Sequence, residues 1–236
     1  MNTSIKLFKK LATVLALSAA FSHAEEIKFE NTAKLLTANF ESRHVVKVEA
    51  GDFHFVPGQI APIHTHAAPA IGYVAKGQII YQIEGEKPQL LNEGDAFYEP
   101  AGPRILRFDN ASATEEAIFV DFNLQQKGEP FIVFEKPLTE NIDRRTLPTI
   151  DLKDQKINQV NIYLTELEAR GKKVLNTNRP ILGYVAEGVV LIKEMGRASR
   201  RYVAGSTYSM KKGQSETYVR NESAEVPAKV IQFYLN

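Results

Sequence analysis

Residues 71–113 read IGYVAKGQIIYQIEGEKPQLLNEGDAFYEPAGPRILRFDNASA, and the same pattern returns at residues 182–224 as LGYVAEGVVLIKEMGRASRRYVAGSTYSMKKGQSETYVRNESA. The displacement is a constant 111 positions, and 15 residues are identical without a gap between residues 69–124 and 180–235. A fixed repeat of this kind indicates two copies of one structural module. Five of the identities are glycines, which suit tight turns, so the turns of the module are expected to recur in both copies.

Each copy carries the pattern of an all-β fold. Short apolar and β-branched runs are separated by glycine, proline or acidic residues at intervals of about ten. The clearest runs are VVKVEAGDFHF (45–55), GYVAKGQIIYQI (72–83), AFYEP (96–100) and EAIFVDFNL (116–124). This spacing predicts antiparallel strands closed into a barrel or jelly roll, which leaves no open sheet edge. A short helix is suggested only around Asn31 to Thr37.

The chain begins with a segment typical of secreted proteins. Three lysines in the first ten residues precede an apolar run of 11 residues from Leu11 to Phe21, and the letters SHA follow. A membrane-spanning helix needs about 20 apolar residues, so this pattern predicts a signal peptide cut after Ala24. We expect a periplasmic or secreted protein with an N-terminal domain at 25–137 and a C-terminal domain at 138–236. Prolines and polar residues between 131 and 151 mark the boundary.

Composition excludes several classes of partner. The chain of 236 residues has no cysteine, so no disulfide can support it. Its formal charge is +1, and cleavage after Ala24 removes three lysines and no acid, which leaves −2. A near-neutral chain has no electrostatic footprint for nucleic acid or anionic lipid. We therefore expect a small-molecule ligand, no nucleic acid, no membrane association after cleavage, and a homodimer as an open alternative.

Two of the five histidines stand one residue apart in GQIAPIHTHAAPAIGYVAKG (58–77). On a strand, residues i and i+2 point to the same face, so His64 and His66 can both reach one ion. The segment resembles the cupin signature, whose two motifs are G-x5-H-x-H-x3-E-x6-G and G-x5-P-x-G-x2-H-x3-N. The positions that match are Gly58, His64, His66, Gly77, Gly94, Pro100 and Gly102. The resemblance implies two tandem cupin barrels, each a jelly roll also described as a double-stranded β-helix.

The resemblance also implies a divalent metal held by three histidines and one glutamate, and half of that set is missing. Ala70 stands at the glutamate position and Ile105 at the third histidine position. Gln82, Glu99, Asp109 or water are the candidates to fill the gap, and the cofactor would be one divalent transition metal, Zn, Fe, Mn, Ni or Cu. In the second copy the four ligand positions are Leu175, Thr177, Ile181 and Glu216, which hold no metal site.

Two functions from different classes stay open. The first is a small-molecule binding protein, in which the N-terminal barrel binds the ligand and the C-terminal barrel is structural. The missing ligands favour it, because a metal-dependent enzyme must retain its ion. The second is a metal-dependent dioxygenase or isomerase that uses His64, His66 and a non-standard third ligand such as Gln82. Residues found only in the first copy are the candidates to line the ligand pocket: Tyr81, Tyr98, Glu99 and Arg104. A metal-free sugar epimerase or lectin-like barrel is a weaker third interpretation.

Overall fold

The computed structural model describes residues 31–138, 141–194, 196–213 and 217–236. The expected signal peptide and Glu216 lie outside these residues. Within them the chain is all-β, as predicted, and no helix that could cross a membrane occurs there. The helix suggested around Asn31 to Thr37 is wrong, because this segment pairs with residues 161–166 as the start of a long strand.

Among the described residues, ten strands lie between residues 31 and 146, and eight follow. The first ten are β1 (Asn31–Phe55), β2 (His64–Thr65), β3 (Ala70–Lys76), β4 (Gln78–Ile83), β5 (Gln89–Asn92), β6 (Ala96–Glu99), β7 (Arg104–Asn110), β8 (Ala117–Gln125), β9 (Val133–Phe134) and β10 (Asp143–Thr146). The others are β11 (Ile150–Leu167), β12 (Lys172–Leu175), β13 (Ile181–Glu187), β14 (Val189–Lys193), β15 (Arg200–Val203), β16 (Thr207–Met210), β17 (Thr217–Asn221) and β18 (Ala228–Leu235).

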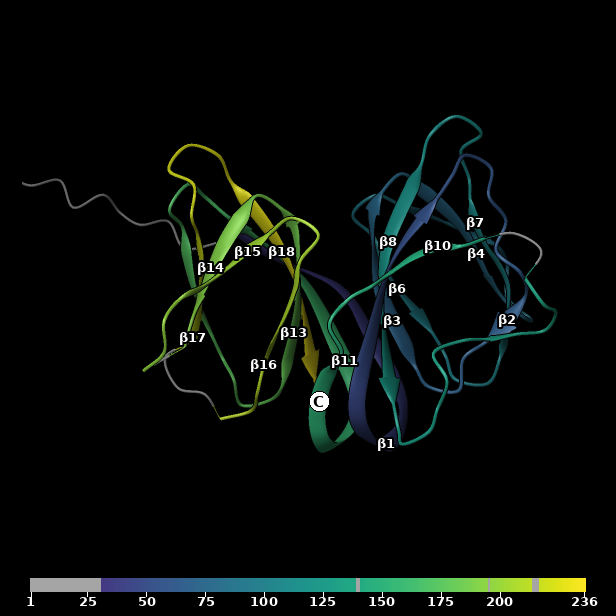
Figure 1. Ribbon diagram of the computed structural model, residues 1–236, viewed down its shortest axis with the longest axis horizontal. Coiled ribbons are helices and arrows are strands. Elements are labelled where there is room, and N and C mark those ends of the chain that lie inside the picture. The colour runs from purple at the N-terminus through teal and green to yellow at the C-terminus, as the bar shows by residue number, and fades with distance from the viewer. Residues whose placement is uncertain (1–30, 139–140, 195, 214–216) are drawn as a thin grey trace, which may run out of the picture.

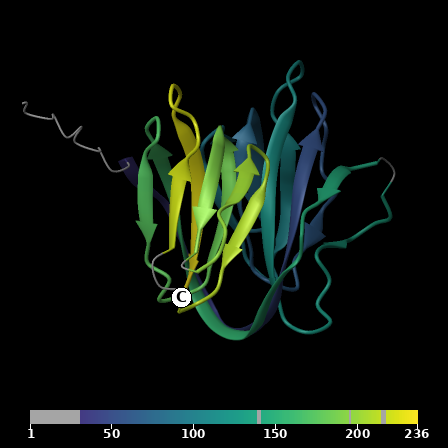
Figure 2. The same cartoon turned by 60° about the vertical axis from the view of Figure 1, so that its left-hand side comes forward.

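The strands form two lobes joined by one continuous sheet (Figure 1). This sheet has nine strands in the order β16-β13-β18-β11-β1-β8-β3-β6, with β10 also paired to β1. A five-stranded sheet, β5-β4-β7-β2-β9, completes the N-terminal lobe, and a four-stranded sheet, β12-β17-β14-β15, completes the C-terminal lobe. The long strands β1 and β11 pair with each other and curve beneath both lobes (Figure 2). Each therefore contributes backbone to both halves of the molecule.

The sequence repeat is matched by a repeat of strand pairing. In the N-terminal lobe β3 pairs with β6 and β8, and in the C-terminal lobe β13 pairs with β16 and β18. The repeated asparagine has the same structural role twice. The Asn110 side-chain amide donates to the carbonyls of Phe55, Val56 and Glu115. The Asn221 amide likewise donates to three carbonyls, those of Leu167, Glu168 and Val226, and so fastens the equivalent loop.

An apolar core lies where the two lobes meet, and repeat-related residues touch across it. The rings of Tyr73 and Tyr184 lie 6.2 Å apart, and those of Phe122 and Phe233 lie 4.8 Å apart. The two members of each pair are 111 positions apart in the sequence. Contact between a residue and its own counterpart is the mark of a two-fold axis, so this contact resembles the interface of a symmetric dimer.

A second core, rich in phenylalanine, fills the N-terminal lobe. Phe53 stacks on Phe119 with ring centroids 4.8 Å apart, and Phe108 packs on the same ring at 4.7 Å. Phe97 lies over Gly72 of the neighbouring strand, where an added Cβ would come within 2.1 Å of its ring. Glycine at this position therefore allows the aromatic ring to pack. These rings surround the buried end of β2, where the two histidines lie.

Candidate metal centre

The two histidines of the motif point into the N-terminal lobe. His64 is on the short strand β2 and His66 follows it by two residues, so both imidazoles lie on one face. They are 4% and 2% exposed, and their ring centroids lie 5.3 Å apart. β2 is held between β7 and β9, which fixes the backbone on both sides.

The Nδ1 atom of each imidazole ring is held by a hydrogen bond to a backbone carbonyl. His64 Nδ1–H donates to the carbonyl of Pro62 at 2.8 Å, and His66 Nδ1–H donates to that of Phe131 at 3.1 Å. Because a carbonyl can only accept, each Nδ1 carries a proton, and each Nε2 can act as a ligand when the ring is neutral. Such a hydrogen bond on the second ring nitrogen is typical of metal-binding histidines.

Glu99 brings a carboxylate to the two imidazoles. Its Oε2 lies 3.3 Å from His66 Nε2, and its Oε1 lies 3.6 Å from His64 Nε2. Glu99 ends β6 and pairs directly with Ala70 of β3. Directly paired residues project side chains to the same face with Cβ atoms about 5 Å apart. The carboxylate that is absent at Ala70 is therefore supplied from the adjacent strand.

The charges of His66 and Glu99 depend on each other. Burial lowers the pKa of His66, but the charge and the hydrogen bond of Glu99, with smaller contributions from Asp121 and the Phe131 carbonyl, together raise the pKa to about 9. Burial raises the pKa of Glu99, yet the charge of His66 and hydrogen bonding from both histidines hold it below its ordinary value. Without a metal, a protonated His66 thus balances an ionised Glu99.

The chamber around these groups is apolar except at Asp121. Asp121 lies on β8, is 3% exposed, and its Oδ1 has no hydrogen-bond partner. Burial, and then the charge of Glu99, raise the pKa of Asp121, which favours its neutral form. The remaining volume is about 30 Å³, which is room for a water molecule and not for an organic substrate.

A larger pocket of about 720 Å³ adjoins this chamber and shares Ala61 and Ile142 with it. Arg104 lines the pocket and is paired with Glu84 and Glu135. Its volume is within the range usual for small-molecule sites, about 300–1,000 Å³. The pocket therefore offers a place for a ligand next to the histidines.

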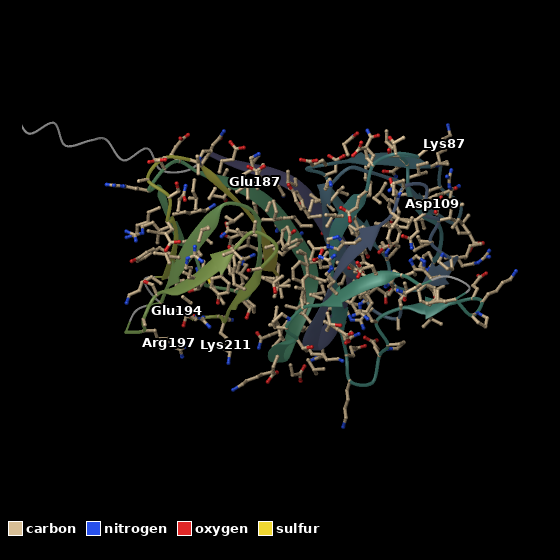
Figure 3. The ribbon with its side chains drawn as sticks, turned by 45° about the horizontal axis from the view of Figure 1, so that its top comes forward. Lys87, Asp109, Glu187, Glu194, Arg197 and Lys211 are labelled. Atoms are coloured by element: carbon tan, nitrogen blue, oxygen red, sulfur yellow. The ribbon has the colours of Figure 1, made fainter. Side chains whose placement is uncertain are left out.

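The other candidates lie elsewhere. Gln82 alternates with the buried Tyr81 on β4, and its amide donates to the carbonyl of Glu86, so it does not join the histidines. Asp109, labelled in Figure 3, accepts from the backbone N–H of Ala61 and from Arg107, and it is not part of the group formed by the two imidazoles and Glu99. Tyr81 donates its hydroxyl to the carbonyl of Tyr98 within the aromatic core. Tyr98 itself packs toward the contact between the lobes.

In the C-terminal lobe the three described residues at the equivalent positions, those that correspond to His64, His66 and Ala70, are apolar or neutral. Leu175 and Ile181 are buried in the core of that lobe, and Thr177 is 6% exposed. Met210 stands at the position that corresponds to Glu99. Among the described residues, His64, His66 and Glu99 form the one group of histidine and acidic side chains close enough together to hold a metal ion.

The sequence analysis did not single out Asp121, which is buried beside the three candidate ligands. An acid within the otherwise apolar run AIFVDFNL, on the same face as Phe119 and Asn123, was the available signal. Polar groups in a buried strand are costly unless they have a partner or a function. Asn123 has such a partner, because its amide donates to the carbonyl of Phe131 beside His66.

The three ligand atoms fit a transition-metal ion. They all lie within 4.8 Å of one another. Two donors bound tetrahedrally to one ion at about 2.1 Å lie about 3.4 Å apart, close to the 3.3 and 3.6 Å between the imidazoles and the carboxylate. His66 Nε2 and Glu99 Oε1 are buried without a well-aligned hydrogen bond, so an ion would satisfy both.

Comparison with known proteins identifies the fold. Residues 51–123, which include all three candidate ligands, match the family model described as the cupin domain. No curated protein matches the chain. The all-β cupin architecture predicted from the sequence is thereby confirmed.

Solved structures with the same fold include proteins named as a decarboxylase, a dioxygenase and a vicilin. Oxalate decarboxylase from Bacillus subtilis is 17% identical with a TM-score of 0.57, over 90% of this chain and 77% of that one. Salicylate 1,2-dioxygenase from Pseudaminobacter salicylatoxidans is 13% identical with a TM-score of 0.55, over 80% and 71%. Vicilin from hazelnut, Corylus avellana, is 12% identical with a TM-score of 0.56, over 85% of each chain. At these identities the likeness shows the fold alone.

Proposed function

We propose that the N-terminal lobe binds one divalent transition-metal ion through His64, His66 and Glu99 and uses it in catalysis on a small organic molecule. The observation that carries this proposal is the convergence of two Nε2 atoms and one buried carboxylate. Two histidines and a carboxylate with open coordination positions are typical of non-haem Fe(II) oxygenases. Of the two reaction classes considered, a dioxygenase is therefore favoured over an isomerase.

The roles of the protein groups follow from their places. A bound ion would act as a Lewis acid or activate dioxygen. Asn123 supports the Phe131 carbonyl that orients His66, and the phenylalanine rings exclude water from the chamber. The substrate would lie in the 720 Å³ pocket, with its reactive end directed past Ala61 and Ile142 toward the histidines.

A metal-free binding protein is the second candidate, and two observations favour it. Ile105 is fully buried opposite His64, so the third imidazole of the family is replaced by packing. The opposite charges of His66 and Glu99 also compensate each other without an ion. In this case the 720 Å³ pocket alone would hold the small molecule.

The wider organisation is part of the proposal. The repeated strand pairing supports two tandem cupin barrels in one chain. The N-terminal sequence pattern supports export to the periplasm or beyond, with cleavage after Ala24.

Metal content tests the proposal and separates the two candidates. Untagged protein purified from the periplasm is loaded with Fe(II), Mn(II) or Zn(II), desalted, and measured by mass spectrometry. We expect about one equivalent of ion in the wild type and background in His64→Ala, His66→Ala and Glu99→Gln. His54→Ala is the matched control, because His54 binds Asp52 and Glu116 outside the chamber and should not affect metal content. Background metal in the loaded wild type would leave the metal-free binding protein.

A further inference from the structure

The wall of the 720 Å³ pocket in the N-terminal lobe is mainly apolar. Seven of the eleven described residues that line it have aliphatic or proline side chains, among them Ile60, Ile63, Leu106 and Ile142. They come from the loop before β2, from β7, and from the segment between β9 and β10. In Figure 1, β2 and β7 lie on the side of this lobe that is turned away from the C-terminal lobe. A cavity of this size with such a lining is typical of a site for a small organic ligand.

Some of the apolar surface at the pocket faces solvent. Ile60 is 72% exposed, the largest value among the large hydrophobic side chains of the described residues. Val56, in the same loop, is 62% exposed, and Leu138 is exposed next to Pro137 of the lining. Single exposed apolar residues are common, but several beside an apolar cavity indicate a binding surface.

The charged groups at the wall are largely paired with each other. Arg104 donates to Glu84 at 2.9 Å and to both carboxylate oxygens of Glu135. Lys136 is the remaining charged residue of the described lining, and it is exposed at the rim, where water and salt screen its charge. Recognition of a ligand at the wall therefore depends mainly on apolar contact.

The neutral polar group of the wall is also occupied. Gln59 is 8% exposed, and its Oε1 accepts from the backbone N–H of Val56 at 3.0 Å. Its Nε2 donates to the carbonyl of Asn141 at 3.5 Å. A sugar or another polyol must replace the hydrogen bonds to water that its hydroxyls lose, and burial without such partners is costly. The pocket thus favours a ligand with few polar groups.

The apolar character continues from the pocket into the chamber of the histidines. The two cavities share Ala61 and Ile142, and the chamber is walled by rings that include Phe53, Phe108 and Phe119. A ligand whose end reaches the chamber meets apolar groups along this whole path. This continuity favours a small molecule over a second copy of the chain, because a protein surface would cover the rim without filling the cavity.

The C-terminal lobe does not repeat this apolar wall. By the repeat, three apolar lining residues have small or polar counterparts: Ile60 corresponds to Gly171, Ala61 to Lys172 and Leu106 to Thr217. The apolar pocket therefore belongs to the half of the chain that carries the two histidines.

We propose that the ligand of this pocket is a neutral, hydrophobic organic molecule, with an aliphatic body against Ile60, Ile63 and Leu106 and one end directed toward the histidines. The inference rests on the proposed function, because it takes this pocket to be the substrate site, and it adds the chemical class of the substrate. It weighs against a sugar as the substrate.

Calorimetric titration with 1-butanol, 1-hexanol and 1-octanol tests this class of ligand. Burial of one methylene contributes about 0.8 kcal/mol, which is about fourfold in affinity. We therefore expect saturable binding of octanol, and an affinity that rises about 200-fold from butanol to octanol. Glucose should show no saturable binding. A rise of less than about tenfold across the series, or glucose binding tighter than octanol, would overturn the proposal.

Matched variants locate the binding. Leu106→Gln and Ile60→Ser should each weaken octanol binding at least about tenfold. Leu90→Gln makes the first change again at an exposed position of β5 outside the pocket, and should bind within about twofold of the wild type. Thermal melting checks that each variant is folded, and Ile60→Ser alters a side chain that is already exposed. Equal losses in folded Leu106→Gln and Leu90→Gln would overturn the proposal.

Two further measurements separate this inference from its alternatives. The titrations are made on protein as purified and after chelation, with metal content measured in each sample. Bound metal without octanol binding would overturn the ligand class and leave the metal function standing, whereas octanol binding without metal would support the ligand class and overturn the metal function. Sedimentation tests the second copy: a wild-type dimer that Ile60→Ser dissociates, with no octanol binding, would overturn the proposal.

Discussion

Metal affinity should depend steeply on pH, because an ion must displace a proton from His66. In the metal-free protein, burial lowers the pKa of His66. The charge and hydrogen bond of Glu99 are the main causes that nevertheless raise this pKa to about 9. At pH 7 about 1% of His66 is then neutral, and each pH unit below 9 lowers the apparent affinity about tenfold. Between pH 6 and pH 8 we expect the affinity for Zn(II) to rise about 100-fold, or about 2.7 kcal/mol.

Calorimetric titration of the metal-free protein with Zn(II) measures this dependence. Repeating the titration in two buffers with different protonation enthalpies counts the protons, and about one proton per ion should be released at pH 7. In Glu99→Gln the charge that raises the pKa of His66 is gone, so binding should be weaker and nearly independent of pH above 7. His44→Ala changes an exposed histidine paired with Asp154 and should keep the wild-type slope. A wild-type affinity that is flat from pH 6 to 8 would refute the reasoning.

The same pKa predicts the stability of the metal-free protein. Because the folded-state pKa of His66 lies above the ordinary value of 6.5, its charged form stabilises the fold fully below about pH 6.5. That contribution is lost as the pH rises through about 9. The sign is opposite to that of metal binding, which grows over the same window, so metal loading should have its largest effect on melting temperature at the alkaline end.

Two further predictions concern the carboxylate and the contact between the lobes. Glu99→Ala should abolish metal retention. Adding Ala70→Glu should restore it, because the two residues pair directly and project to the same face. A folded double variant that does not regain metal would contradict the replacement of the carboxylate across the two strands. Phe122→Ala should lower the free energy of unfolding in urea by about 3–5 kcal/mol, because a fully buried ring is removed from the contact with Phe233. Leu90→Ala, at a side chain that is 51% exposed, should change it by less than about 0.5 kcal/mol, and similar losses in both variants would argue against a shared core.

The fold could be predicted because its signals are local. Glycines such as Gly77 and Gly188 adopt positive φ angles of 75° and 77°, which few other residues tolerate, so the turns leave a direct trace in the sequence. The prediction of a helix at 31–37 was wrong because the structure of this segment is set by a distant partner strand and not by local signals. Ala33, Lys34 and neighbouring leucines favour a helix locally, but pairing along β11 gives the backbone a partner strand, and tertiary context outweighs propensity.

The sequence identified the two histidines of the candidate site but not Glu99 as their partner, because the position of Glu99 depends on the register between β3 and β6. Along the chain, Ala70 indicates a lost ligand, and Glu99 and Asp109 both lie within the second motif, so the sequence does not distinguish between them. Only the pairing of β3 with β6 shows that Glu99 projects beside the histidines, while Asp109 accepts from the backbone of Ala61. Register between strands 29 positions apart is set by packing of the whole lobe and leaves no short motif.

The pairing of Tyr73 with Tyr184 and of Phe122 with Phe233 has a consequence for how the two lobes can diverge. In a dimer of identical chains, every substitution occurs on both sides of the axis at once. Here both sides belong to one chain, so each half can change alone while the shared contact is kept. One half can therefore hold imidazoles and a carboxylate while the other has leucine, threonine and methionine at the corresponding positions. Because both lobes belong to a single chain, a symmetric architecture need not perform the same chemistry in both halves.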